Sequence, residues 1–175
     1  IIMIGEIRGA ETAEIAVRAA ITGHLVLSTM HTNDSASTVT RLMDMGIEPY
    51  LVASSVVGVV AQRLVKKICT NCRKEVRPTQ SERELLHLAD GDMLYRGTGC
   101  GICGNTGYRG RTAIHEVMPM TREIRERIAH RATIDELRAA AAEHGTISLR
   151  DSCSRLVKEG ITTSEEMLKI TYRLE

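Results

Sequence analysis

Aromatic side chains are almost absent from this sequence of 175 residues, which has no Trp, no Phe and only four Tyr. Proteins that bind single-stranded nucleic acid or RNA usually stack bases on aromatic side chains. The charges also nearly cancel, with 23 Lys and Arg against 22 Asp and Glu. The overall charge therefore attracts neither nucleic acid nor an anionic membrane, and we expect no nucleic-acid partner.

Long apolar runs are missing as well. The longest, Val56 to Ala61, ends at Gln62 and is far shorter than the roughly 18 apolar residues of a membrane-spanning helix. The five cysteines follow no secretory leader, which favours the cytoplasm, where paired cysteines more often hold metal than form disulfides. Because the chain opens inside an apolar run, we expect it to be the C-terminal part of a longer protein.

The first 33 residues combine strand, helix and strand patterns, in a chain whose hydrophobic content of 43% can form a core. Ile1 to Ile4 form a continuous apolar run closed by Gly5, which is typical of a strand buried on both faces. A helical pattern follows from Glu11 to Ile21, and Gly23 suits its left-handed end. A second apolar strand spans Leu25 to Ser28. This order predicts an α/β fold with a βαβ unit, whose right-handed crossover makes the strands parallel.

Glu6 and His31 each follow one of these strands. The carboxyl ends of parallel strands share one edge, where open α/β sheets bind ligands. A carboxylate there can hold Mg²⁺ through water or orient the attacking water in phosphoryl transfer. Glu6 alone is more simply an ordinary acid at a strand end. The polar residues around His31, namely Thr29, Thr32 and Asn33, form a cluster that favours a catalytic role for Glu6 and His31.

His24 and Arg63 are weaker site candidates with plainer explanations. His24 begins its strand, which places it roughly 20 Å from His31, toward the opposite edge of the sheet. We therefore interpret His24 as a structural histidine bonded to backbone. Arg63, with Gln62, can simply close an apolar strand at the surface, although an arginine there can also meet phosphate or a neighbouring subunit.

Four of the five cysteines form two CxxC pairs, Cys69 with Cys72 and Cys100 with Cys103. Each pair presents two thiolates, and the segment between the pairs can fold back to complete a tetrahedral zinc site. The glycines around the second pair permit the turns that aim amide hydrogens at sulfur. The alternative, coincidental placement in a reduced protein, is far less favoured by this spacing. Cys153 falls on a helical apolar stripe, so we expect a buried core thiol there.

The residue composition predicts how the rest of the chain is divided into elements and domains. Residues 49–64 are split near Gly58 into a helix and a β-branched strand, and a module boundary falls at Cys69. A short strand is expected over residues 112–118, and capping-box spacings then predict helices that begin near residues 133, 148 and 163. The predicted domains are therefore residues 1–68, a tetracysteine module over 69–111, and a strand with a helical bundle over 112–175.

These residues resemble the secretion ATPases of type II secretion and type IV pilus assembly, often called GspE/PulE-like, over almost the entire chain. Residues 1–8, IIMIGEIR, are similar to the Walker B motif of that family, with Glu6 as its glutamate. Residues 22–34, TGHLVLSTMHTND, are similar to its His box. Further segments match in order: AQRLVKKIC, the paired CxxC, GYRGRTAIHEVM and LRDSCSRLVKEGITTSEEM.

The resemblance implies the C-terminal part of a RecA-like P-loop ATPase core, followed by a zinc module. It implies a cytoplasmic homohexamer at the inner-membrane face that uses Mg-ATP and works on secretion or pilus platform proteins. Glu6 and His31 then become catalytic, Arg8, His24 and Arg63 become nucleotide-site candidates, and the zinc is structural. The presence of the cysteine module favours secretion or pilus extension over pilus retraction, and we lean toward secretion.

Two departures from the family pattern stand out. Gly9 follows Arg8 where the family usually has Asp, so any role of that aspartate is absent or moved. The Walker A pattern GxxxxGK[ST] does not occur, so the chain cannot cradle an ATP phosphate chain alone and is expected to be inactive by itself. The alternatives are a pilus-assembly ATPase and, from another class, a non-catalytic zinc-ribbon binding module.

Overall fold

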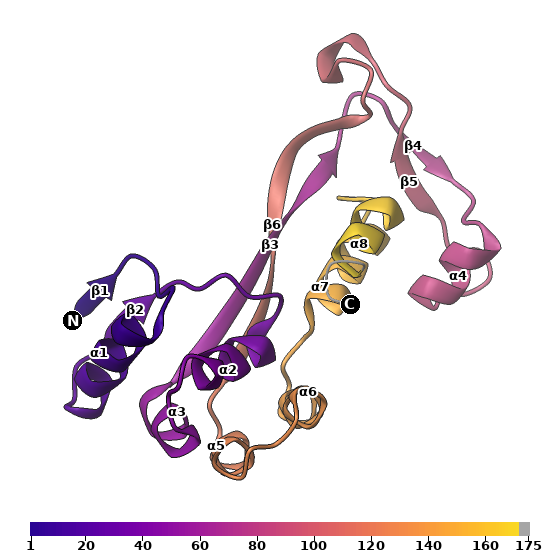
Figure 1. Ribbon diagram of the computed structural model, residues 1–175. Helices are drawn as coiled ribbons and strands as arrows, with labels where there is room; N and C mark the ends of the chain where they lie inside the picture. Colours follow the sequence, from indigo (N-terminus) through magenta and orange to yellow (C-terminus); the bar gives the residue numbers. More distant parts are fainter. Residues whose placement is uncertain (172–175) are drawn as a thin grey trace. The chain divides into compact units, whose positions relative to one another are not determined.

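The computed structural model describes residues 1–171 of the 175 (Figure 1). The chain divides into two compact units, and each is made from separate stretches of sequence. The first unit combines residues 1–61 with 116–147, and the second combines 62–115 with the residues from 148 onward. Each unit is described by itself below.

The first unit opens with the predicted βαβ arrangement. Strand β1 (Ile2–Ile4) is followed by helix α1 (Ala10–Ile21) and strand β2 (Val26–Ser28). The two strands pair in parallel, with Met3 opposite Leu27. Helix α1 ends at Thr22, and Gly23 has a φ of 91°, a left-handed conformation that suits glycine. The α/β class and the parallel pair predicted from the sequence are confirmed.

The strand β1 is not buried on both faces, contrary to the prediction. Ile4 packs against the core of the first unit, whereas Met3 is 80% exposed. Successive side chains of a strand point to opposite faces, so one face of this two-stranded sheet is covered and the other is bare within residues 1–171. The apolar run predicted burial on both faces because the sequence pattern cannot show which neighbouring elements are present.

Four helices complete the first unit: α2 (Ser35–Asp44), α3 (Pro49–Ser55), α5 (Arg122–Ala129) and α6 (Ile134–Glu143). Helix α3 packs on α1 and α5, while α6 packs on α5 and α2. Their apolar faces meet in one core, whose fully buried members include Val39, Val52, Met118, Ile124, Ile128 and Leu137. This core therefore joins residues from both stretches of the unit.

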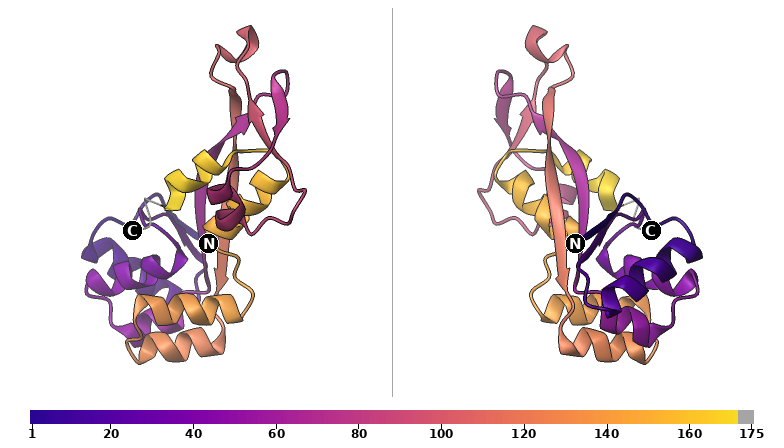
Figure 2. Two further views of the ribbon diagram at one scale, coloured as in Figure 1. Left: turned by 90° about the vertical axis from the view of Figure 1, so that its right-hand side faces the viewer. Right: turned by 90° about the vertical axis from the view of Figure 1, so that its left-hand side faces the viewer.

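Two long strands, β3 (Gly58–Ile68) and β6 (Tyr108–Pro119), pair with each other in a two-stranded sheet, as Figure 2 shows. The predicted change from helix to strand near Gly58 is confirmed, because α3 ends at Ser55 and β3 begins at Gly58. Strand β6 is longer than the predicted span of residues 112–118.

The second unit contains the cysteine-rich part of the chain. Strand β4 (Arg73–Val76) pairs antiparallel with β5 (Leu94–Gly97), and helix α4 (Gln80–Leu86) lies between them in sequence. A single 3₁₀ turn spans Gly101–Cys103. Two helices complete the unit, α7 (Leu149–Lys158) and α8 (Ser164–Thr171), and they pack on each other.

The helices after residue 112 are shared between the units. The first pair, α5 and α6, belongs to the first unit, and the second pair, α7 and α8, belongs to the second. The helix starts predicted from the capping spacings are found: the side-chain oxygens of Thr133, Ser148 and Thr163 accept from the amides of Glu136, Asp151 and Glu166. The division into domains 1–68, 69–111 and 112–175 stays a prediction. Among the described residues, no helix is both long and apolar enough to cross a membrane.

Candidate functional site

Glu6 and His31 meet where β1 and β2 end. Glu6 lies two residues beyond β1, and His31 lies three residues beyond β2. Because the strands are parallel, both residues emerge at the same edge of the sheet. His31 Nε2 lies 3.1 Å from Glu6 Oε1, so the structure brings together the two residues that the sequence singled out.

The carboxylate of Glu6 is held by Arg8. Arg8 Nε donates to Glu6 Oε2 at 2.7 Å, and this hydrogen bond, with the nearby charges of Arg8 and His31, lowers the pKa of the Glu6 carboxyl. The other oxygen, Oε1, is buried, makes no hydrogen bond of good geometry, and lies 3.1 Å from His31 Nε2. Glu6 is therefore an ionised carboxylate, with one oxygen bound by Arg8 and the other, buried oxygen in contact with His31.

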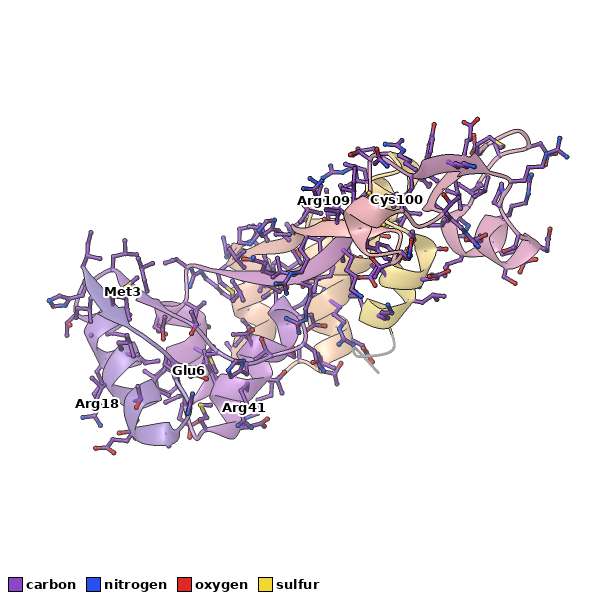
Figure 3. The ribbon with its side chains drawn as sticks, turned by 90° about the horizontal axis from the view of Figure 1, so that it is seen from above. Met3, Glu6, Arg18, Arg41, Cys100 and Arg109 are labelled. Atoms are coloured by element: carbon purple, nitrogen blue, oxygen red, sulfur yellow. The ribbon has the colours of Figure 1, made fainter. Side chains whose placement is uncertain are left out.

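A pocket of about 150 Å³ opens beside Glu6. It is lined by Glu6, Ile7, Arg8, Met30, His31, Arg41 and Met45. Glu6 and Arg41 lie on the same side of the first unit in Figure 3. The pocket therefore combines one carboxylate with three side chains that are or can be cationic, an arrangement suited to an anionic ligand.

Sequence reasoning missed Arg41. It lies on α2, on the same helical face as Thr38 and Met45, because these positions are three and four residues away. The side-chain hydroxyl groups of Thr38 and Thr32 are 2.8 Å apart, which turns this face toward the loop that carries His31. Helical spacing measured from Thr38 is the signal in the sequence that could have found Arg41.

His24 and Arg63 lie elsewhere. His24 Nδ1 is 3.2 Å from the Ala19 carbonyl oxygen at the end of α1, in an exposed position, and its structural role stays a prediction. It precedes β2, whereas His31 follows that strand. Arg63 lies on the part of β3 that belongs to the second unit, and its Nη1 donates to the carbonyl of Gln62 at 2.9 Å. The pocket beside Glu6 is lined by residues of the first unit.

The four cysteines of the CxxC pairs converge in the second unit. Cys69 follows β3, and Cys72 precedes β4. Cys100 precedes the 3₁₀ turn after β5, and Cys103 is the last residue of that turn. All four sulfur atoms lie within 4.8 Å of one another. The shorter separations are 3.9 Å for Cys69 to Cys100, 3.9 Å for Cys72 to Cys103 and 3.7 Å for Cys100 to Cys103. The predicted set of four cysteines is brought together and can bind a metal ion.

Backbone amides and a glycine contact shape the cysteine cluster. The amides of Cys100 and Gly107 donate to Cys103 Sγ at 3.2 and 3.3 Å, as the glycine-rich sequence predicted. Gly107 also accepts at its carbonyl from the amide of Cys69 at 2.9 Å. A Cβ on Gly97 would lie 2.0 Å from the Gly107 carbonyl oxygen, so only glycine permits this approach.

The cysteine cluster fits zinc. Zinc with Zn–S bonds of about 2.3 Å in a tetrahedron separates its sulfurs by about 3.8 Å, close to the shorter separations here. Burial raises the pKa of Cys72 to about 11, and a hydrogen bond from the Asn71 side chain helps to lower that of Cys100 to about 6. A bound cation would offset this difference between the pKa values of Cys72 and Cys100, because it favours the thiolate form of every cysteine ligand.

Cys153 is separate from the cluster. It is fully buried on α7, and burial, with the charge of Glu166, raises the pKa of its thiol to about 12. A thiol with such a pKa is protonated at neutral pH and is a poor nucleophile and metal ligand. Cys153 is therefore the core thiol that its helical position predicted.

Comparison with known proteins identifies the family of the chain. The family described as Type II/IV secretion system protein matches residues 1–169. The chain belongs to this family. It is 50% identical to the type II secretion system protein HxcR of Pseudomonas aeruginosa over 98% of its own length, which is 33% of that protein. It is 45% identical to the type IV pilus assembly ATPase PilB of Thermus thermophilus, over 98% of this chain and 20% of PilB.

The family resemblance seen in the sequence is thus confirmed. Among solved structures, the ATPase DotB of Legionella pneumophila aligns with a TM-score of 0.61 and 22% identity, over 98% of this chain and 38% of DotB. The Yersinia pseudotuberculosis DotB gives 0.62 and 21%. These two likenesses show the fold. The chain spans about a third or less of the curated relatives that it matches.

Proposed function

We propose that this chain is the C-terminal part of a hexameric ATPase that hydrolyses ATP to power type II protein secretion. The observation that carries the proposal is the ionised Glu6, held beside His31 at the shared edge of β1 and β2. Relatives named type II secretion proteins support the choice of system. Type IV pilus assembly is the second candidate, favoured by the 45% identity to PilB.

Each pocket residue has a role in this proposal. Glu6 is the catalytic carboxylate: its Oε2 accepts from Arg8, and the carboxylate acts as the base toward the attacking water. His31 is the second catalytic residue, beside that oxygen. Mg-ATP, when bound, supplies the γ-phosphate to be attacked and the cation that offsets its charge. Arg8 and Arg41 line the pocket and are proposed to donate to phosphate oxygens, while His24 and Arg63 remain weaker candidates for nucleotide contact.

The pocket at Glu6 represents only part of a nucleotide site. No GxxxxGK[ST] pattern occurs in residues 1–175, and such a loop supplies most of the affinity for phosphates. The proposal therefore assigns the phosphate-binding loop to a part of the full-length protein outside this chain. Residues 1–175 alone are expected to be inactive.

The cysteine cluster has a structural role in the same proposal. Cys69, Cys72, Cys100 and Cys103 hold one zinc ion, and four thiolates leave no open position for water or substrate. The zinc therefore folds its module and takes no part in hydrolysis. The proposal also includes assembly as a homohexamer in the cytoplasm, at the inner-membrane face, in contact with secretion or pilus platform proteins. The names of the relatives support a part in secretion or pilus assembly.

Replacing Glu6 tests the enzymatic proposal. In the full-length protein, cloned with its upstream reading frame, Glu6→Gln should lower ATP turnover by roughly 100-fold or more. Nucleotide affinity should change by less than about threefold, because glutamine keeps the shape but cannot act as a base. The control is Glu14→Gln, an exposed acid on α1 outside the pocket.

Two further comparisons complete this experiment. Residues 1–175 measured in the same assay should show no turnover above background. A Glu6→Gln enzyme that keeps more than half of the wild-type turnover would overturn the catalytic assignment. Complementation of deletion strains, scored separately for secreted enzyme and for assembled pili, then decides between the two transport systems.

A further inference from the structure

The loop between β2 and α2, residues 29–34, carries His31 and is fastened at its start. Thr29 Oγ1 donates to the carbonyl of Gly5 at 2.7 Å. The amide of Ile7 donates to the carbonyl of Thr29 at 2.9 Å. These two bonds enclose Glu6 in sequence, so the beginning of the loop moves with the segment that carries the catalytic carboxylate.

The end of the loop is fastened to the first turn of α2. Asp34 is the N-cap residue of this helix, and its Oδ1 accepts from the amide of Ser37 at 2.7 Å. The carboxylate side chain of Asp34 is only 8% exposed. A buried carboxylate is costly unless it is paired, so its remaining oxygen needs a partner.

Arg138 on α6 is that partner. Its Nε and Nη2 atoms donate to Asp34 Oδ2 at 2.9 and 2.7 Å. Arg138 Nη1 also contacts Asp135 on its own helix at 3.1 Å, which holds the guanidinium in place. A residue far along the chain thus fixes the position at which the His31 loop ends.

Glu116 on β6 holds the same turn from another element. Its carboxylate accepts from the amide of Ser35 at 2.9 Å and from the Ser35 hydroxyl. Glu116 is buried, and the amides of a first helical turn carry partial positive charge. Two elements distant in sequence, α6 and β6, therefore converge on residues 34 and 35.

We propose that Arg138 and Glu116 are positioning residues, which fix the first turn of α2 and thereby hold His31 beside Glu6. This inference rests on the proposed function of the Glu6–His31 pair. Neither positioning residue lines the pocket beside Glu6. Only Thr32 and Asn33 separate His31 from Asp34, so a displaced Asp34 displaces the imidazole.

Loss of either contact should impair the chemical step more than nucleotide binding. Displacement of a catalytic group by about 1 Å can cost on the order of 100-fold in rate, because the reactive geometry is no longer pre-organised. The predicted signature is a lower kcat with a nearly unchanged KM. A residue that served stability alone would lower the melting temperature and leave the kcat of the folded enzyme unchanged.

The primary test uses Arg138→Met in the full-length enzyme. We expect kcat to fall by roughly 10-fold or more, with KM for ATP within about threefold of wild type. Arg138→Lys should recover part of the loss, because it restores the charge without the paired donors. The matched control is Arg131→Met, which removes an exposed contact of 3.3 Å to Glu48 and should leave kcat within about twofold.

Two additional measurements keep the proposal testable if Arg138→Met folds poorly. Glu116→Gln preserves the size of the side chain and should also lower kcat. The double variant Arg138→Met with Asp34→Asn should lower kcat little more than the more damaging of the two single variants, because both substitutions remove the same Arg138–Asp34 interaction. Unchanged kcat in Arg138→Met and in Glu116→Gln would overturn the proposal.

Hydrogen–deuterium exchange separates this inference from the proposed function. In the full-length protein, Arg138→Met should accelerate amide exchange in residues 29–36 while leaving α1 unchanged. This result does not require ATP hydrolysis. If His31→Ala leaves turnover intact, the catalytic proposal fails, yet the exchange experiment still tests whether Arg138 holds the loop. Identical exchange in residues 29–36 of wild type and variant would refute the positioning role.

Discussion

The four sulfur atoms of the cysteine cluster come from residues 69–103, whereas the pocket at Glu6 depends on residues from 6 to 138. The cluster is closed, with its ligands already at distances that suit zinc. The pocket is open, and the loop that carries His31 is held by α6 and β6. Short spacings in the sequence bring the four cysteines together, whereas the loop beside Glu6 is bound by side chains from distant parts of the chain.

The two sites also treat charge differently. In the pocket, the hydrogen bond from Arg8 lowers the pKa of the Glu6 carboxyl, so this group is ready as an anion. In the cysteine cluster, burial raises the pKa of Cys72 to about 11, so this thiol reaches its working state only with a cation. The Glu6 carboxyl is thus favoured as an anion without a ligand, whereas Cys72 would need a bound cation to become a thiolate at neutral pH.

The largest effect should come from breaking the closed site. Cys72→Ser removes one of four ligands and should abolish tight zinc binding, with unfolding of the module over residues 69–111. Cys153→Ser should retain about one zinc per chain, because this thiol lies outside the cysteine cluster. Metal analysis and circular dichroism of the two variants make the comparison. Wild-type protein that is folded and free of zinc would contradict the assignment.

Breaking the open site should have a smaller effect on structure and a large effect on rate. In the full-length enzyme, His31→Ala should lower kcat by roughly 10- to 100-fold with little change in melting temperature, because His31 is exposed. His24→Ala should instead lower the melting temperature slightly and keep kcat within about threefold, because His24 contacts the end of α1.

Measured kcat and melting temperature for both histidine variants distinguish the two roles. Equal losses of kcat with unchanged melting in both variants would show that the contrast between the two histidines is wrong. His24 would then belong with the nucleotide contacts.

The smallest predicted effect concerns hydrogen bonds of Glu82 that join residues far apart in sequence within the second unit. Glu82 on α4 accepts from Arg96 on β5 at 2.8 Å and from the hydroxyl of Ser164 on α8. Burial alone would raise its pKa, but hydrogen bonds from Ser164, Thr79 and Arg96 together lower it to about 2. The pKa of Glu82 in the folded protein is below its ordinary value of 4.5, so the stabilisation is complete above about pH 4.5 and is lost as pH falls toward 2.

Glu82→Gln should therefore lower the free energy of unfolding by roughly 1 to 2 kcal/mol at pH 7, a value reduced for partial solvent exposure. Urea unfolding from pH 7 down to pH 3 should show the difference from wild type shrinking below about pH 4.5. Glu84→Gln, an exposed acid on the same helix, is the control and should have a smaller effect. A pH-independent difference would exclude the charge of Glu82 as its source.

Sequence reasoning succeeded where the decisive residues are close together. The βαβ order predicted that Glu6 and His31 would share an edge, and the CxxC spacing predicted the four-cysteine set. Both rules depend on local geometry, because strand direction and knuckle formation follow from a few neighbouring residues.

The failures involve contacts between distant residues. The pattern around Met3 predicted burial, but local periodicity cannot show that one face of the sheet has no neighbour among residues 1–171. The ties of Arg138 to Asp34 and of Glu116 to Ser35 join separate elements through single polar side chains. Such side chains look like ordinary solvated charges in the sequence, because their partners are set by tertiary packing.

The interleaving of the two units affects the order in which the chain can fold during synthesis. The core of the first unit joins residues 7–53 with residues 118–141, so it cannot close until the ribosome has passed residue 141. The cysteine module over residues 69–111 is complete earlier. In the folded module, the amide of Cys69 donates to the carbonyl of Gly107 at 2.9 Å. The two stretches of the first unit are then joined through this contact rather than through a long flexible loop. Zinc binding would then reduce the loop-closure entropy that the first unit must overcome.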